Sequence, residues 1–380
     1  MLVTLLAAVT FAIWLYLSAG RGGFWLAAER DAGGPVPASW PAVVAVIPAR
    51  DEAEGVAECI GSLLGQDYPG AFSIILVDDL STDDTAEIAR RAAASAGMPD
   101  RLTVLAGKPL PAGWTGKLWA MKQGIDEAQK RAPGYLLLTD ADIAYTSDTL
   151  TRLVARAEKD GLVLNSLMAK LRCESLAERA LIPAFVFFFQ MLYPFAWVNR
   201  PERATAAAAG GCMLVRADAL AAAGGIVSIR GELIDDCALA RRLKQHGAIR
   251  LSLTERVRSL RAYPALGDIR YMVARSAYAQ LRFSPLLLAA TVAGMALTYL
   301  APVLLTLFGH GLAQAFGTAG WTMMAMAFQP TLRLYRGSPL WGVLLPAIAL
   351  AYVVFTLDSA YQHARGAGGL WKGRAQAGLQ

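Results

Sequence analysis

The stretch YLLLTDADI, residues 135–143, limits the fold more than any other part of this chain. Its β-forming residues Tyr135–Leu138 predict a buried strand, and the polar run that follows sets Asp140 and Asp142 one residue apart. Open α/β sheets bind ligands at the carboxyl edge of their parallel strands. Two carboxylates at that edge predict a seat for a hard divalent cation such as Mg²⁺. A polar turn that caps a helix near Ser147 is the alternative.

Strands and helices alternate on both sides of this stretch. The expected strands are Val43–Ala49, Ser73–Asp79, Leu102–Gly107, Tyr135–Asp142 and Cys212–Val215. The expected helices are Glu54–Leu64, a helix capped at residues 81–84 and ending near Ala94, Lys117–Arg131, Asp218–Ala223 and Ala238–Gln245. This alternation predicts an α/β fold with a largely parallel sheet and helices on both faces.

The composition indicates that part of the chain lies in lipid. Of its 380 residues, 55% are hydrophobic and 17% charged, with a mean hydropathy of +0.39. Leu2–Ala19 is long enough to span a bilayer. No Lys or Arg precedes it, as a cleavable signal peptide requires, whereas Arg21 and Arg30 follow it. We therefore expect an uncleaved anchor with the bulk of the protein in the cytoplasm.

Further apolar segments occur later in the chain. Leu181–Val198 contains two prolines, which favours an interfacial or re-entrant segment, with a buried core helix as the alternative. Asp268–Gln280 has the pattern of an amphipathic helix at a membrane surface. Three C-terminal runs could cross a membrane: Leu286–Phe308, the weaker Leu312–Phe328, and Leu340–Leu357. The basic residues around them conflict with one another under the positive-inside rule, so the number of crossings stays open.

These segments give a domain plan. We expect an anchor at 1–20, a linker at 21–41, an α/β domain at 42–265 that includes the apolar segment 181–198, an amphipathic helix at 266–284, transmembrane helices at 285–362 and a tail at 363–380.

Charge, cysteine and histidine usage exclude several classes of function. The net charge is +6, but the basic residues are spread along the chain, which argues against nucleic acid and suits a membrane protein. The cysteines show no C-x-x-C spacing, which favours buried thiols in a reducing compartment: Cys59, Cys173, Cys212 and Cys237. The histidines are isolated, so neither a zinc site nor a histidine-based triad is supported.

Acidic pairs recur at Asp78-Asp79, at Asp140 and Asp142, and at Asp235-Asp236, with Gly116-Lys117 opening a helix suited to phosphate. The ordered set PARDE, VDDLSTDDT, GWTGKLWA, TDAD and LIDDCALARRL resembles the nucleotide-sugar glycosyltransferases of family 2, which have the Rossmann-like GT-A fold. The similarity runs from about Val43 to Leu243. Within this family, the run VFFFQMLYPFAWV and the C-terminal apolar segments resemble those of the membrane hopanoid-associated (hopene-associated, HpnB-type) enzymes.

The resemblance implies a role for each matching residue. Nucleotide-sugar-binding roles fall on Pro48, Arg50, Glu52, Asp78, Asp79, Lys117, Asp140 and Arg282. Asp142, with Asp140, would hold Mg²⁺ or Mn²⁺ on the donor diphosphate. Taken singly, these aspartates could be helix caps and Lys117 a solvated charge.

The family's Glu-Asp pair falls on Asp235-Asp236, which makes Asp236 the expected catalytic base, with Asp235 beside it. A base beside an acceptor hydroxyl and a cation on the leaving diphosphate suit a single displacement with inversion. The pair is Asp-Asp here, and the Q-x-x-R-W motif is reduced to Gln280-Leu281-Arg282-Phe283. Transfer of one sugar is therefore expected rather than processive polymer synthesis.

The sequence thus predicts an inverting, metal-dependent glycosyltransferase of the bacterial inner membrane, multi-pass, with a cytoplasmic catalytic domain. Its expected partners are a nucleotide-diphosphate sugar, the lipid bilayer and a membrane lipid acceptor of the hopanoid type. The alternatives are a polyprenyl-phosphate or carotenoid glycosyltransferase and a non-catalytic scaffold of a lipid-synthesis complex. The sequence is silent on the sugar, the nucleotide and the oligomeric state.

Overall fold

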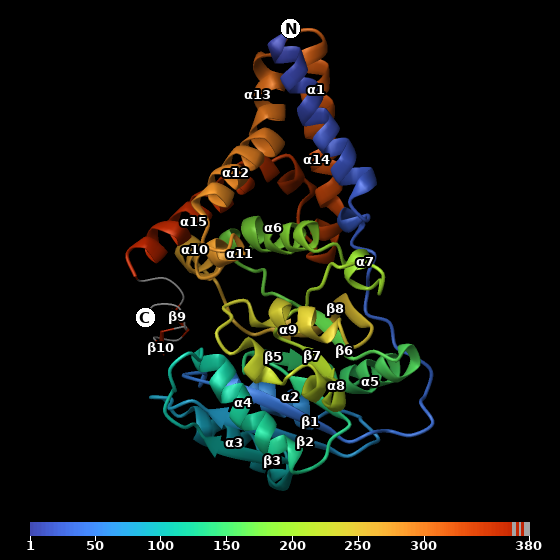
Figure 1. Ribbon diagram of the computed structural model, residues 1–380, viewed down its shortest axis with the longest axis vertical. Helices are drawn as coiled ribbons and strands as arrows, with labels where there is room; N and C mark the ends of the chain where they lie inside the picture. The colour runs from blue at the N-terminus through green and yellow to red at the C-terminus, as the bar shows by residue number, and fades with distance from the viewer. Residues whose placement is uncertain (367–369, 372–373, 376–380) are drawn as a thin grey trace. The chain divides into compact units, whose positions relative to one another are not determined.

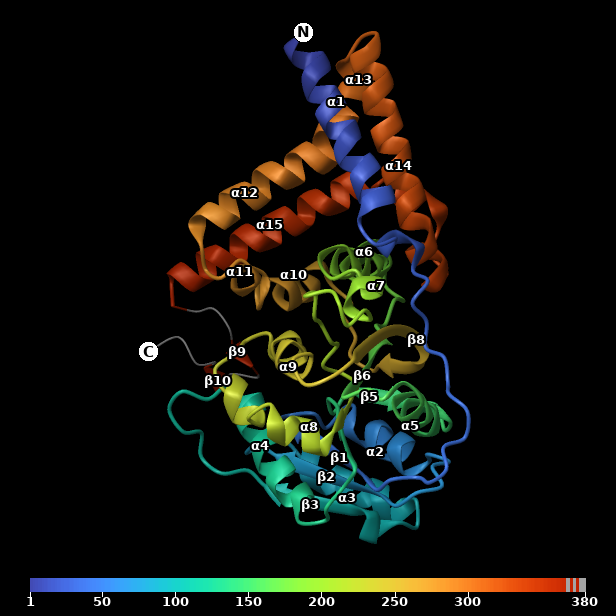
Figure 2. The same ribbon diagram turned by 45° about the vertical axis from the view of Figure 1, so that its right-hand side comes forward.

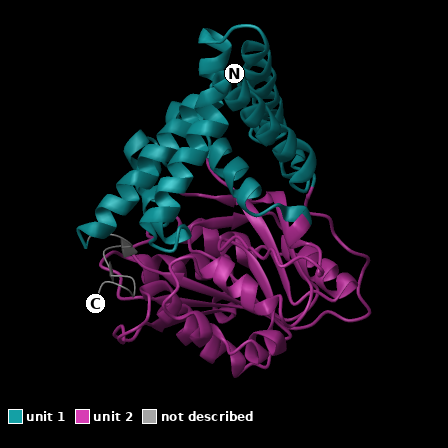
Figure 3. Cartoon of the chain, turned by 45° about the horizontal axis from the view of Figure 1, so that its top comes forward, with its two compact units in different colours: residues 1–28, 173–196, 262–369 teal, residues 29–172, 197–261, 370–380 magenta. Residues whose placement is uncertain are grey.

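The computed structural model describes residues 1–366, 370–371 and 374–375. The chain divides into two compact units, coloured separately in Figure 3. We call residues 1–28, 173–196 and 262–369 the helical unit, and residues 29–172, 197–261 and 370–380 the α/β unit. Residues 173–196, within the span predicted for the α/β domain, group with the helical unit. The predicted tail, 363–380, lies partly outside the described residues.

In the described part of the α/β unit, eight strands form one sheet in the order β3-β2-β1-β4-β7-β6-β8-β5 (Figure 1). The strands are β1 (Val43–Ala49), β2 (Phe72–Asp78), β3 (Leu102–Ala106), β4 (Tyr135–Leu138), β5 (Ile143–Tyr145), β6 (Leu164–Lys170), β7 (Met213–Arg216) and β8 (Ile249–Ser259). β1 pairs in parallel with β2 and β4, and β2 pairs in parallel with β3. Because β2 and β4 flank β1, the strand order reverses beside β1, which is where open α/β sheets bind ligands.

The other half of the sheet is mixed. β7 pairs antiparallel with both β4 and β6, and β5 pairs antiparallel with β8. β4 ends at Leu138 instead of Asp142, because its ladders with β1 and β7 both stop there. Asp140 and Asp142 therefore lie in a turn that leads into β5.

Helices cover both faces of the parallel strands, as predicted. The helices of this unit are α2 (Val56–Leu64), α3 (Thr85–Ser95), α4 (Gly116–Gln129), α5 (Thr149–Asp160), α8 (Ala217–Ala222) and α9 (Asp235–Leu243), with short 3₁₀ turns at Pro99–Arg101 and Ile226–Ile229. Ala45 and Ile47 of β1 join a core with α2. Val46, on the opposite face, meets Gly124 of α4, where a Cβ would lie 2.5 Å from Val46 Cγ1. Alternate residues of one buried strand thus hold helices on opposite sides.

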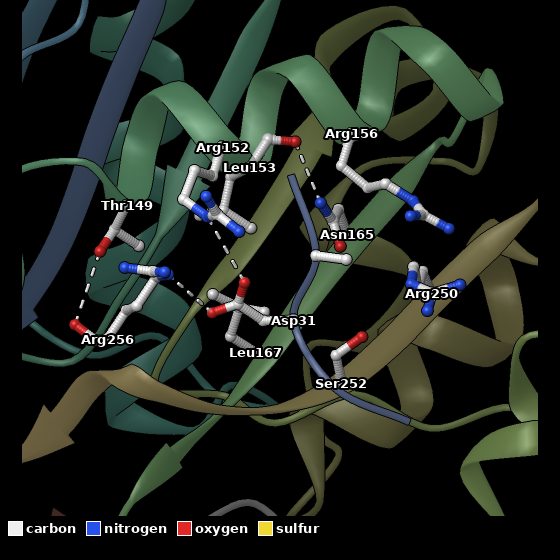
Figure 4. A pocket seen from close by; sticks show the side chains of 11 residues that line it. Asp31, Thr149, Arg152, Leu153, Arg156, Asn165, Leu167, Arg250, Ser252 and Arg256 are labelled. Carbon is white, nitrogen blue, oxygen red and sulfur yellow. Dashed lines mark hydrogen bonds and ion pairs between the residues drawn. The ribbon is translucent and has the colours of Figure 1, made fainter. Parts of the chain in front are cut away.

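The middle of the predicted linker is docked on this sheet. Arg30 forms a parallel bridge with Leu253 of β8. Figure 4 shows Asp31 in a pocket beside α5, between Arg152 and Arg256, at 3.7 and 3.4 Å from their Nε atoms. Thr254 Oγ1 also donates to Asp31 Oδ2 at 2.6 Å. These contacts attach the chain to the α/β unit well before β1 begins.

The helical unit contains most of the apolar segments. Its helices are α1 (Leu2–Leu15, continued by the π-turn Tyr16–Gly20), a 3₁₀ turn at Phe24–Leu26, α6 (Leu176–Leu192), α10 (Leu266–Ala274), α11 (Ala277–Gln280), α12 (Pro285–Met295), a π-turn at Ala296–Leu300, α13 (Ala301–Phe308), α14 (Leu312–Leu334), a 3₁₀ turn at Pro339–Gly342 and α15 (Leu345–Ala364). In the short helix α7 (Phe195–Val198), Phe195 and Ala196 are grouped with the helical unit and Trp197 and Val198 with the α/β unit. In Figures 1 and 2, α1 lies beside α14, and α12 beside α15.

By length and composition, four helices among the described residues could cross a membrane: Leu2–Gly20, Leu176–Val198, Pro285–Phe308 and Leu345–Ala364. Only 17% of the first segment and 11% of the third are buried, so these two helices present apolar side chains outward. α14, which contains the weaker expected span Leu312–Phe328, is not among the four.

The apolar run predicted to be interrupted by prolines is one helix over most of its length. α6 begins with a capping box in which Ser175 and Glu178 exchange side-chain and backbone hydrogen bonds, and it continues through Pro183. It ends at Leu192, because Tyr193 precedes Pro194 and a residue before proline disfavours the helical conformation. In its apolar window 61% is buried, so much of α6 belongs to the core of its unit.

The predicted amphipathic segment Asp268–Gln280 is two short helices, α10 and α11. Ile269 and Val273 of the predicted apolar face are buried. The hydroxyl of Ser359 on α15 donates to the carbonyl of Ala274 and accepts from the backbone N–H of Tyr278, the latter at 3.0 Å. These bonds bridge the break between the two helices and dock them on α15.

Candidate active site

Hydrogen bonds join the loops after β1 and β2 at the carboxyl edge of the sheet. Arg50 Nη1 donates to the carbonyls of Asp79 and Leu80, at 2.5 and 2.9 Å. Asp51 Oδ1 accepts the backbone N–H of Thr82 at 2.6 Å. Asp51 adopts φ +50°, a left-handed conformation that Asp tolerates better than most residues. Arg50 therefore orders this edge through backbone carbonyls.

The strand-two aspartates differ in their surroundings. Asp78 Oδ1 accepts the backbone N–H of Ser81 at 3.2 Å, a hydrogen bond within the turn that precedes α3. Asp79 is fully buried, and its backbone N–H donates to the carbonyl of Ala49 at 2.8 Å. Pro48, also predicted for nucleotide binding, is buried within β1. These residues all lie at or near the ends of two adjacent parallel strands.

Lys117 joins two of the predicted acidic pairs. It lies in the first turn of α4, which Thr115 caps by accepting the backbone N–H of Leu118 at 3.3 Å. Lys117 Nζ lies 2.9 Å from Asp140 Oδ1 and 3.2 Å from Asp235 Oδ2. Only 16% of the Lys117 side chain is exposed. The alternative of a solvated surface charge is therefore wrong for this lysine.

Asp236 lies beside this ion-paired cluster at the start of α9. Its Oδ2 accepts the backbone N–H of Gly210 at 3.0 Å, and its Oδ1 accepts that of Cys237 at 2.6 Å. A Cβ on Gly210 would lie 3.4 Å from Lys117 Nζ and 3.5 Å from Asp236 Oδ2. The loop before β7 thus passes close to both the lysine and the expected base, at a glycine.

Burial and charge set the protonation of the cluster. Burial raises the pKa of Asp236, the charge of Asp235 raises it further, and Lys117 only partly opposes them, so the pKa of Asp236 is about 6. Burial lowers the pKa of Lys117, but the charges of Asp140 and Asp235 outweigh it and its pKa is raised. Burial is also the largest cause of the raised pKa of Asp140. Lys117 therefore stays charged, while Asp236 can exchange a proton near neutral pH.

Asp142 is held by an arginine that sequence reasoning did not single out. Arg261 Nε lies 2.6 Å from Asp142 Oδ2. Its Nη2 lies 2.7 and 3.0 Å from the two carboxylate oxygens of Glu52. One guanidinium thus bridges the loop after β1 and the turn after β4. The alternation of Ile249, Leu251 and Leu253 could have revealed β8, and so placed Arg261 just beyond a strand end.

The carboxylates of Asp140 and Asp142 are chemically suitable ligands for a divalent cation. Asp140 and Asp142 offer the hard oxygen atoms that Mg²⁺ and Mn²⁺ prefer, and the charge of Asp142 adds to burial in raising the pKa of Asp140. Over the described residues, however, no three His, Cys, Asp or Glu side chains are grouped as cation ligands. Lys117 and Arg261 provide positive charge at these two carboxylates. A metal ion would compete with Arg261 for Asp142.

Arg282, the remaining expected donor contact, belongs to the helical unit. It lies between α11 and α12 with φ +53°. Its role in binding the diphosphate stays a prediction.

Residues 44–223 match the family described as Glycosyl transferase family 2. The chain contains a family 2 glycosyltransferase domain. The match includes Lys117, Asp140 and Asp142 and stops before Asp235. Enzymes of this family are glycosyltransferases, as the motifs predicted. A comparison with curated proteins gave no match.

A solved structure shares the fold of this chain. A mannosyltransferase from Pyrobaculum calidifontis, solved with GDP-Man and Mn²⁺, aligns with a TM-score of 0.55 and 19% identity, covering 95% of this chain and 99% of its own. The likeness shows the GT-A-type α/β sheet with its surrounding helices. S. aureus TarS with UDP-GlcNAc aligns with a TM-score of 0.39 and 15% identity, over 86% of this chain and 92% of its own. Mycobacterium tuberculosis glucosyl-3-phosphoglycerate synthase with Mn²⁺ and UDP-Glc gives 0.37 and 18%, over 62% and 77%.

Proposed function

We propose that the protein transfers one sugar, with inversion, from a nucleotide-diphosphate sugar to a hydroxyl of a membrane lipid, of the polycyclic hopanoid type. The observation that carries this proposal is the cluster in which Lys117 bridges Asp140 and Asp235, with Asp236 alongside. The cluster lies at the carboxyl edge of a family 2 sheet, and the described part of the chain has four helices apolar enough for a membrane. An enzyme held in a membrane by such helices can reach an acceptor that is dissolved in the lipid.

In this proposal Asp236 is the base. A lipid hydroxyl is a poor nucleophile until its proton is removed during attack on the anomeric carbon, and a positioned base is worth about 10²–10⁴-fold in rate. Hydrogen bonds from Gly210 and Cys237 fix the direction of the carboxylate. Its pKa of about 6 leaves it mostly ionised at neutral pH and still basic enough to accept a proton.

The remaining residues would receive the donor. Lys117, held in place by Asp140 and Asp235, offers a buried positive charge to phosphate oxygens. Mg²⁺ or Mn²⁺ bound by Asp140 and Asp142 would neutralise charge on the departing diphosphate. Pro48, Arg50 and Asp79 shape the edge where the nucleoside would lie. The catalytic unit is proposed to face the cytoplasm of a bacterium from its inner membrane.

The test is lipid analysis combined with one substitution. Mass spectrometry of lipids from cells with and without the protein should reveal a glycolipid whose mass identifies sugar and acceptor. D236N should lower its formation by about 10²–10⁴-fold while nucleotide-sugar binding persists. D218N is the matched control, since Asp218 pairs with Arg216 and 74% of its side chain is exposed. Unchanged lipids, or full turnover by D236N, would refute the proposal.

A further inference from the structure

We propose that Arg261 is an exchangeable counter-ion for Asp142: it occupies that carboxylate until the donor and its metal ion arrive together, and then pairs with the donor diphosphate. The inference rests on the proposed function and assigns a positioning role to a residue outside the range that matches the family, 44–223. With Arg261 in this role, the affinity of the protein for the metal ion depends on whether the donor is bound.

The contacts of Arg261 place a positive charge where a cation would bind. The guanidinium uses Nε for Asp142 at 2.6 Å and Nη2 for Glu52 at 2.7 and 3.0 Å. The carboxylates are well covered, with 15% of the Asp142 side chain and 13% of that of Glu52 exposed. A divalent ion at Asp142 must therefore displace a charge-assisted pair and would be repelled by the arginine if it stayed.

Arg261 is placed so that it can move. β8 ends at Ser259, and Arg261 follows in a segment without helix or strand that leads into α10. The backbone N–H of Leu260 donates to the carbonyl of Asp142 at 2.7 Å, which keeps the segment attached while the side chain is 35% exposed. A side chain on such a segment can change partners without breaking a sheet ladder.

The donor supplies the alternative partner. Guanidinium groups bind phosphate oxygens in the same forked manner as carboxylates. When a diphosphate with its metal ion enters, Asp142 gains the metal and Arg261 gains the phosphate, so neither charge is left unpaired. Without the diphosphate, metal binding removes the pair between Arg261 and Asp142 and supplies no phosphate in exchange. Metal and donor should consequently strengthen each other's binding, and this coupling must be reciprocal.

The first experiment measures Mn²⁺ binding to the full-length protein in detergent, without nucleotide, by electron paramagnetic resonance. R261Q should bind Mn²⁺ at least about tenfold more tightly than the wild type, since a hydrogen-bonded ion pair no longer competes. R261K, which keeps the charge, should remain within about threefold of the wild type. The matched control is R258Q on β8, because Arg258 pairs with Glu58 and is largely exposed. Equal or weaker Mn²⁺ binding by folded R261Q would overturn the proposal.

Two further measurements distinguish competition by the Arg261 guanidinium from a general loosening of the packing around Asp142. E52Q removes one partner of Arg261 but keeps the guanidinium beside Asp142, so it should not gain Mn²⁺ affinity; a tenfold gain would show that loosened packing admits the ion, against the proposal. Calorimetry with UDP and GDP should show that the nucleotide raises Mn²⁺ affinity less in R261Q than in the wild type, by about tenfold. Equal enhancement in both proteins would overturn the exchange, whereas no nucleotide binding in either would refute the proposed function itself.

Discussion

Asp236 is the side chain whose charge governs the proposed reaction. A base must be ionised to accept a proton, and the pKa of Asp236 is about 6 because burial and Asp235 outweigh Lys117. We expect kcat/KM to be constant above this pH and to fall about tenfold per pH unit below it. The measurement is a pH profile of sugar transfer, with protein integrity checked at each pH. A profile that stays flat down to pH 4 would exclude Asp236 as the base.

Lys117 should set the position of the acid limb, which is the part of the pH profile where kcat/KM falls as the pH is lowered. Its positive charge lowers the pKa of Asp236, so K117M should move the limb to higher pH in addition to weakening donor binding. K122M on the same helix is the control, since Lys122 pairs with Asp126 outside the cluster. An unshifted limb in K117M would show that the lysine does not act on the base electrostatically.

The position of Lys117 depends in turn on how α4 packs. Gly124 allows this helix to approach the sheet: a Cβ there would lie 2.5 Å from Val46 Cγ1 and 3.0 Å from Val77 Cγ2. β-branched valines in strands cannot yield easily, so G124A should lower the free energy of unfolding by about 1–3 kcal/mol. It should also reduce turnover, because the start of α4 moves with the helix.

Gly61 on α2 provides the matched control. A Cβ at this exposed helical position meets nothing within 4 Å. G61A should therefore stabilise the protein by up to about 1 kcal/mol through helix propensity and leave turnover unchanged. Thermal unfolding in detergent and a turnover assay measure both variants. Equal stability of G124A and G61A would contradict the packing described for α4.

The protein as a whole should behave as an integral membrane protein. Segments Leu2–Gly20 and Pro285–Phe308 leave most of their apolar residues uncovered within the helical unit, and lipid is the medium that such surfaces prefer. After lysis it should sediment with membranes, resist extraction by high salt and alkaline carbonate, and dissolve in detergent.

A variant lacking residues 1–20 tests whether the anchor acts alone. It should remain in the membrane fraction because two other segments, Pro285–Phe308 and Leu345–Ala364, are also apolar enough to span. It should be less stable, since Trp14 is fully buried and its Nε1 donates to the carbonyl of Thr298 at 2.7 Å. Release of the full-length protein by salt alone would contradict membrane insertion.

Features with a local signal could be predicted from the sequence. The strand Val43–Ala49 is β1 to the residue, because a fully buried apolar run marks its own ends. The acidic residues after β1, β2 and β4 could be assigned to one sheet edge, because parallel strands end on the same side. The strands β6 and β8 were missed. Asn165 and Ser166 interrupt the apolar run of β6, and Glu255 breaks the alternation that begins β8.

The sequence by itself determined the α/β class, the glycosyltransferase motifs and the apolar segments, because each depends on residues that are close together in the chain. Only the tertiary structure decided that Lys117 bridges Asp140 and Asp235, and that Arg261 reaches Asp142 across 119 residues. These contacts depend on the sheet order, on the antiparallel strand β7, and on β8, which pairs in parallel with β6. Hydrophobic periodicity indicates which face of a strand is buried, but not which strand lies beside it.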